Sequence, residues 1–136
     1  SANYYSKIAK NLVIGACDII KNSSSHRNTR IKIIDAPGVF EIPVLISKNI
    51  KKYDAFIALG CVIKGQTPHF DYISKSSIDG IMYLSIISKK PIGNGILTCL
   101  NKSQAEKRSI ISNKKNKGAE AANAVISIFK NGTKKI

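Results

Sequence analysis

A short polar loop, Lys64-Gly65-Gln66-Thr67-Pro68-His69, carries residue types suited to binding an anion and moving a proton. It follows the apolar run 55–60, which is too short for a helix and is typical of a strand buried on both faces. A helical apolar pattern begins directly behind it. Open α/β sheets bind ligands where a strand feeds such a loop, and a helix N-terminus offers free N–H groups to an anion. Thr67 adds a hydroxyl, Lys64 a cation, and His69 an imidazole that accepts and donates protons near neutral pH.

The simpler interpretation of this loop is a surface turn with a chance histidine, which holds for most loop histidines. Here the residue types and the position of the loop agree, so the pattern favours a functional site. The other histidine, His26, falls in the polar run 22–28 and is predicted to be a solvated loop residue.

The rest of the chain alternates predicted strands and helices. Strands are predicted at 31–35, 55–62 and 92–98, and helices at 1–22, 40–49, 70–88, 101–109 and from Ala119 to Phe129. Gly93 and Gly95 suit a close approach of the backbone to a ligand. The alanines of the last helix should let it pack closely on a neighbour. The alternation predicts an α/β fold: a flavodoxin-like three-layer sandwich with a four-stranded, mostly parallel sheet and helices on both faces.

Length and composition indicate one globular domain over residues 1–136. Hydrophobic residues make up 43% of the chain, but no apolar run is long enough to cross a membrane, and no leader is visible. The three cysteines are widely spaced and odd in number, so they are predicted to be reduced and buried in a cytoplasmic protein. With two histidines and no ligand spacing, no metal site is predicted.

The formal net charge of +14 has two interpretations. A strongly basic domain is a common footprint of nucleic-acid binding. However, the lysines are spread along the chain, and no nucleic-acid-binding motif accompanies them. We therefore expect a solvated basic surface that draws anionic substrates inward, with no nucleic-acid partner.

Three ordered motifs resemble the lumazine synthase family. They are GCVIKGQTPHFDY at residues 60–72, APGVFEIP at 36–43 and NKGAEAA at 116–122. The resemblance covers nearly the whole chain. It implies a cofactor-free condensation of 5-amino-6-ribitylamino-pyrimidinedione with 3,4-dihydroxy-2-butanone 4-phosphate. The products are 6,7-dimethyl-8-ribityllumazine, phosphate and water.

The resemblance also implies a role for each matching residue. His69 occupies the proton-transfer position. The phosphate-binding positions are Gln66, Thr67 and Arg108, and Lys117 matches the lysine of the Asn-Lys-Gly motif. The positions that hold the ribityl chain are Val39, Phe40 and Glu41. The pyrimidinedione pocket would be lined by Cys61, Val62 and Ile63.

The chain departs from the family pattern in four places. Tyr4 stands where the stacking aromatic is usually Phe or Trp, and Asn94 replaces an aromatic that the adjacent subunit donates in many members. The segment 108–116 is about one residue longer than usual and has a different sequence. Family members have a strand before the first helix, and this chain is expected to lack it. An exposed sheet edge would follow unless another chain covers it.

The assembly implied by the resemblance is a homopentamer with active sites at subunit interfaces. One subunit would supply Tyr4, Glu41 and His69, and its neighbour Asn94, Arg108 and Lys117. The altered turn and the high like charge favour a free pentamer, or a pair of them, over a sixty-chain shell. Two other interpretations stay open at this point: a basic module that binds phosphate without chemistry, and a nucleic-acid-binding protein.

Overall fold

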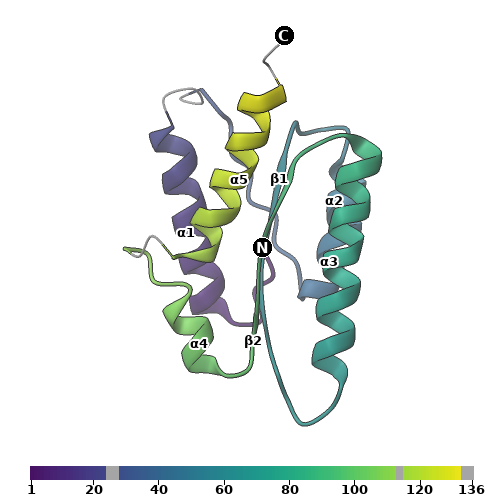
Figure 1. The fold of residues 1–136 in the computed structure, drawn as a ribbon, viewed down its shortest axis with the longest axis vertical. Helices are drawn as coiled ribbons and strands as arrows, with labels where there is room; N and C mark the ends of the chain where they lie inside the picture. Colours follow the sequence, from purple (N-terminus) through teal and green to yellow (C-terminus); the bar gives the residue numbers. More distant parts are fainter. Residues whose placement is uncertain (24–27, 113–114, 133–136) are drawn as a thin grey trace.

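A computed structural model describes residues 1–23, 28–112 and 115–132 of the chain. Its elements form three layers, with a parallel sheet between two layers of helices (Figure 1). Helices α1 (Ser6–Asn22), α4 (Lys102–Lys107) and α5 (Lys117–Gly132) lie on one side of the sheet. On the other side lie α2 (Ile42–Asn49) and α3 (His69–Ser88). The predicted loop position of His26 falls outside the described residues.

The sheet consists of β1 (Phe56–Ile63) and β2 (Ile92–Cys99), which pair in parallel from Phe56↔Ile92 to Ile63↔Cys99. Both strands were predicted to within one residue at each end. Their apolar runs are continuous because helices bury both faces of a parallel sheet. The connection between the two strands contains α3. Because the strands are parallel, their carboxyl ends lie together at one end of the sheet (Figure 1).

The prediction of a four-stranded sheet was wrong, because the described residues contain two strands. Residues 31–35, predicted as a strand, form none. A cavity of about 1040 Å³ separates this segment from the outer edge of β1. A strand needs a continuous ladder of hydrogen bonds to a partner, and here only one parallel bridge forms, between Ala2 and Ala36. Propensity alone therefore does not make the segment a strand.

The first residues of the chain join this segment to β1 at one end of the cavity. The N–H of Ala2 donates to the carbonyl of Leu59 at 2.8 Å, and the N–H of Ala36 donates to the carbonyl of Ser1 at 2.8 Å. The nitrogen of Ser1 donates to the carbonyl of Ile34 at 2.7 Å. Residues 1–3 thus occupy the space between Ala36 and β1.

Helices α1 and α5 pack on each other and on the sheet. The alanines at 119, 121 and 122 are buried, and a Cβ added to Gly93 of β2 would lie 2.5 Å from the carbonyl oxygen of Ala121. The same helix lies against Gly95. These alanines and glycines therefore serve the packing of α5 on its own sheet. No ligand is needed to explain the two glycines, and no second subunit is needed to explain the alanines.

The opposite layer begins with a 3-10 turn, η2 (Val39–Glu41), which leads into α2 with Pro43 in its first turn. The helix predicted at 40–49 is therefore split into two elements. Helix α3 packs on η2, α2 and both strands, with Ile81 buried and Ile73 and Leu84 half-buried. Its outer face leaves large apolar side chains exposed, among them Tyr72, Met82, Tyr83, Ile86 and Ile87.

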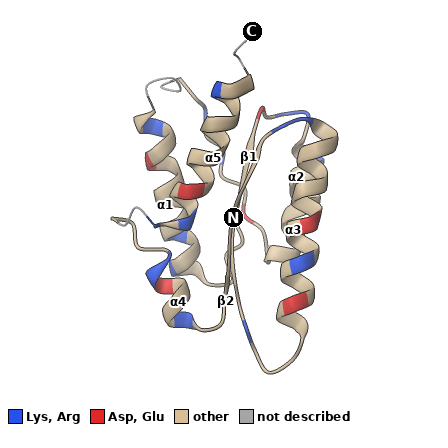
Figure 2. Ribbon diagram, in the orientation of Figure 1, with Lys and Arg blue, Asp and Glu red and all other residues tan. Residues whose placement is uncertain are grey.

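Lysine and arginine are distributed over both helical layers with acidic residues between them, rather than gathered on one element (Figure 2). No helix among the described residues combines the length and apolarity needed to cross a bilayer.

Candidate active site

The loop of residues 64–68 connects β1 to α3 at the edge where both strands end (Figure 1). The N–H of Lys64 donates to the carbonyl of Cys99 at 2.9 Å, which fixes the start of the loop to the end of β2. Gln66 and Thr67 are exposed. Helix α3 begins at His69, and the imidazole is also exposed. The loop therefore presents its amide, hydroxyl and imidazole groups to solvent beside a helix N-terminus.

The η2 turn lies beside the same half of β1. A Cβ added to Gly60 would lie 2.7 Å from Cγ2 of Val39 and 3.1 Å from Cβ of Ala2, so both residues pack directly on the strand. Val39 is buried, whereas Phe40 is 57% exposed and Glu41 is half-buried. The side chain of Val39 is thus part of the core, and Phe40 and Glu41 are accessible to a ligand.

Tyr4 is 79% exposed and its ring meets the ring of Tyr5 edge to face, with centroids 5.0 Å apart. Tyr5 packs against the core cluster that contains Cys61. Desolvation raises the pKa of Tyr5, with smaller contributions from Cys61 and Tyr4. The exposed ring of Tyr4 therefore lies near the last residues of β1.

The three residues expected to line one pocket do not share a face of β1. Cys61 and Ile63 belong to the cluster under α1 and α5, whereas Val62 packs with the cluster under α2 and α3. Successive side chains of a strand point to opposite faces, so this separation follows from the strand itself. Their side chains cannot line one pocket within a single chain.

The main chain of these residues offers a different kind of contact. The carbonyl of Leu59 accepts from Ala2 on the edge of β1 that faces away from β2. In a parallel strand, alternate residues direct their N–H and C=O groups to the same edge. The polar main-chain groups of Cys61 and Ile63 therefore point to that outer edge, on the side of the N-terminal segment.

Burial, with a smaller contribution from Cys99, raises the pKa of Cys61 to about 12. The Cys61 side chain is 7% exposed. The group is a neutral thiol at physiological pH, and a neutral buried thiol is a poor nucleophile. Cys61 is therefore a structural residue of the site.

A second cluster of polar residues lies beyond the end of β2, around α4 and the turn between α4 and α5. Asn101 caps α4 by accepting from the N–H of Gln104 at 2.9 Å, and Arg108 ends the helix with its side chain exposed. Desolvation raises the pKa of the Cys99 thiol, while the positive charge of Arg108 acts to lower it. The guanidinium thus acts electrostatically on the end of β2.

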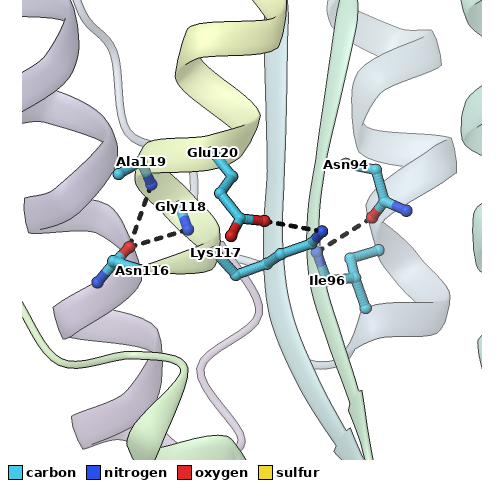
Figure 3. Close-up of polar contacts among 7 residues, drawn as sticks. All are labelled: Asn94, Ile96, Asn116, Lys117, Gly118, Ala119 and Glu120. Atoms are coloured by element: carbon cyan, nitrogen blue, oxygen red, sulfur yellow. Dashed lines mark hydrogen bonds and ion pairs between the residues drawn. The ribbon is translucent and has the colours of Figure 1, made fainter. Parts of the chain in front are cut away.

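Lys117 is joined to Arg108 through the main chain, since its N–H donates to the carbonyl of Arg108 at 2.9 Å. The ammonium group of Lys117 pairs with Glu120 at 3.2 Å in the first turn of α5 (Figure 3). The main chains of the two expected cationic residues are therefore joined.

Asn94 was expected to contribute to the site from the same subunit as Arg108 and Lys117, but the structure places it away from these cations. Asn94 lies opposite Ala58 in the middle of β2, and its Oδ1 accepts from the N–H of Ile96 at 3.1 Å. Ile92 and Ile96, which share its face, pack with the cluster under α2 and α3. Figure 3 shows Asn94 and Lys117 on opposite sides of the strand. Within one chain the structure does not bring Asn94 to Arg108 or Lys117.

Sequence reasoning missed Asn116, which is fully buried and hydrogen-bonded to the start of α5 (Figure 3). An asparagine directly before a helix is a common N-cap, so its position before Lys117 and Gly118 was the available signal.

The fold and this edge define an α/β protein with an exposed histidine loop and a pair of cations beyond the ends of two parallel strands. A family model described as 6,7-dimethyl-8-ribityllumazine synthase matches residues 1–131. The chain belongs to the 6,7-dimethyl-8-ribityllumazine synthase family.

Curated relatives carry the same name. The protein of Nitratidesulfovibrio vulgaris (strain DP4) is 42% identical over 121 residues, which cover 88% of this chain and 76% of the relative. The protein of Blochmanniella pennsylvanica is 43% identical over 125 residues, covering 90% and 78%. That of Mycobacterium avium (strain 104) is 34% identical over 128 residues, covering 93% and 78%. All three are named 6,7-dimethyl-8-ribityllumazine synthase, and the non-catalytic alternatives are not favoured.

Proposed function

We propose that this protein condenses 5-amino-6-ribitylamino-pyrimidinedione with 3,4-dihydroxy-2-butanone 4-phosphate to form 6,7-dimethyl-8-ribityllumazine. One observation carries the proposal: the loop that leads to His69 lies at the end of β2. The hydrogen bond from the N–H of Lys64 to the carbonyl of Cys99 fixes it there. Family membership supplies the reaction, and the chemistry of this edge suits it. No cofactor is required by the proposed reaction.

His69 is proposed to transfer protons during the condensation. Its imidazole is exposed at the first residue of α3, so a bound substrate can reach it. Forming the imine and losing phosphate both require protons to move between substrate atoms. An imidazole suits this work because it can both accept and donate a proton.

The phosphate group is proposed to bind between the loop and the cations. Gln66 and Thr67 offer an amide and a hydroxyl, and Arg108 offers a planar fork of donors that suits a bidentate contact with an oxyanion. Lys117, whose N–H donates to the carbonyl of Arg108, would add a second positive charge. The basic surface of the molecule would draw the doubly charged substrate toward this group.

The pyrimidinedione is proposed to bind at the outer edge of β1 through the main chain of Cys61 and Ile63. The ring alternates N–H and C=O groups, as a strand edge does, so the two can pair. Val62 would supply an apolar contact from the other face, and the ring of Tyr4 would stack on the heterocycle. The ribityl chain would reach Phe40 and Glu41, whose carboxylate can accept from its hydroxyls.

A homopentamer is proposed to complete the site. The exposed apolar face of α3 supports an interface, with Tyr72, Tyr83 and Ile86 exposed by 70%, 64% and 66%. An interface would also explain how Asn94 of one chain could meet residues of another. We propose a free pentamer or a pair of pentamers in the cytoplasm, where the three free cysteines stay reduced.

The direct test mixes both substrates with the purified protein and follows the fluorescence of the lumazine product. We expect a rate that rises in proportion to protein concentration above the spontaneous reaction. A rate equal to that of the protein-free mixture would contradict the proposed activity. Light scattering tests the assembly: a mass of five or ten chains supports it, and a mass of one chain overturns the interface site.

A further inference from the structure

One asparagine connects three segments of the chain behind the two cations of the site. Asn116 is 0% exposed and lies directly before α5. Its Oδ1 accepts from the N–H groups of Gly118 at 2.9 Å and Ala119 at 3.1 Å (Figure 3). Its Nδ2 donates to the carbonyls of Asn11 at 3.2 Å, Ser109 at 3.1 Å and Ile110 at 3.3 Å. The amide thus ties α1, the turn after α4, and the start of α5 together.

These bonds sit next to the groups proposed to bind phosphate. Arg108 directly precedes Ser109, and Lys117 directly follows Asn116. The N–H of Lys117 also donates to the carbonyl of Arg108 at 2.9 Å. The loop between the two cations is therefore closed at its base, which reduces the entropy that a ligand must remove to bring the cations together.

The position of the amide is fixed by close packing of the helices around it. A Cβ added to Gly15 of α1 would overlap the side-chain amide of Asn116. A Cβ added to Gly118 would overlap the carbonyl of Leu12. Asn116 can therefore move only if α1 and α5 separate. Because its donors and acceptor are all bonded and buried, breaking them is costly.

Only a side-chain amide makes both sets of bonds. The acceptor caps α5, a role that aspartate fills equally well. The donors hold the carbonyls of Ser109 and Ile110, and a carboxylate in the same place would repel them. We propose that Asn116 is a positioning residue that sets Arg108 and Lys117 for the phosphate of the substrate. This inference rests on the proposed function of those two cations.

The test uses Asn116→Asp in the full-length protein, with inorganic phosphate and the butanone phosphate as probes. Aspartate keeps the cap of α5 and loses the donors. We expect the inhibition constant of phosphate and the KM for the butanone phosphate to rise roughly tenfold, because the charge-assisted contacts lose their geometry. The KM for the ribityl substrate should not change. A general loss of structure would instead lower kcat and raise both KM values.

Asn123→Asp is the matched control, because Asn123 is an exposed residue of the same helix and the change adds the same charge. It should leave the phosphate inhibition constant unchanged. Arg108→Ala distinguishes a failure of the proposed anion site from a failure of the positioning role of Asn116. If Arg108→Ala leaves phosphate inhibition unchanged, the anion site itself is wrong. If Arg108→Ala weakens it and folded Asn116→Asp does not, the positioning role alone is overturned.

A measurement on the unchanged protein covers the case in which Asn116→Asp does not fold. Phosphate is titrated into ¹⁵N-labelled protein, and the Asn116 side-chain amide and the Arg108 Nε–H signals are followed. We expect both to shift with the same saturation curve. A shift at Arg108 without any change at Asn116 would overturn the coupling between them.

Discussion

The loop of residues 64–68, which follows β1 and leads into His69, and the turn that joins α4 to α5 are held differently. Every residue from Lys64 to His69 is exposed, and a Cβ added to Gly65 would meet nothing within 4 Å. The two ends of the turn, at Ser109–Ile110 and at Asn116, are by contrast held together by the hydrogen bonds of a fully buried amide, which makes five in all.

This difference in exposure and hydrogen bonding suits two different roles in the proposed reaction. A proton-transfer group must reach substrate atoms that change position during the reaction, and an exposed side chain directly after the loop allows this. A phosphate group needs charged donors at fixed positions, and preorganised donors bind it without an ordering cost. We infer that His69 carries the proton transfer, and that the turn fixes the cations of a phosphate site to which Gln66 and Thr67 of the loop add neutral donors.

The largest effect should come from the loop. His69→Ala removes the proposed proton-transfer group, and we expect kcat to fall by about 10²–10⁴-fold, the usual contribution of general acid–base catalysis. Substrate binding should stay near normal, and a residual rate should survive because the bound substrates still react through proximity. Steady-state kinetics measure this, and wild-type turnover in the variant would remove His69 from the mechanism.

The next effect tests how rigidly the turn is packed. Gly118→Ala places a methyl group against the carbonyl of Leu12, so α1 and α5 must separate. We expect a loss of about 1–3 kcal/mol or more in the free energy of unfolding, as for other overpacked sites. Denaturant unfolding measures it. A variant as stable as the parent would mean that the two helices are not closely packed at this point.

Phosphate binding comes third. Arg108→Ala removes one charged donor from the turn, and we expect the affinity for inorganic phosphate to fall by about 1.5–3 kcal/mol. The affinity for the ribityl substrate should hardly change. Calorimetry with each ligand checks both statements. Unchanged phosphate affinity would move the anion site elsewhere.

The smallest effect is expected in the loop. Gly65→Ala adds a methyl group to open space, and no described glycine has a positive φ. The free energy of unfolding should change by less than about 0.5 kcal/mol, as for most exposed positions. The same denaturant experiment compares it with Gly118→Ala. Similar losses in the two variants would remove the contrast between the loop and the turn.

Much of the fold was predictable because it depends on local pattern. The continuous apolar runs of β1 and β2 and the helical spacing of α3 identified those elements almost to the residue. Residues 31–35 were misassigned because their β-branched side chains report a local preference, whereas a strand also requires a partner along its length. Within the described part of the chain, the one bridge at this segment joins Ala36, directly after it, to Ala2.

The site was predictable where a motif matched and less so where tertiary contacts decide. The separation of Val62 from Cys61 and Ile63 follows from the period of a strand and could have been expected. The role of Asn116 could not, because its bond to the carbonyl of Asn11 spans 105 residues of sequence. Sequence alone indicated at most a helix cap at that position.

The most direct test of a division between chemistry and binding is the steady-state kinetics of His69→Ala, Arg108→Ala and the double variant. We expect kcat to fall with His69→Ala alone, and the KM for the butanone phosphate to rise with Arg108→Ala alone. The double variant should show both effects, multiplied without coupling. If Arg108→Ala instead lowered kcat as much as His69→Ala and left KM unchanged, the loop and the turn would not divide the work in this way.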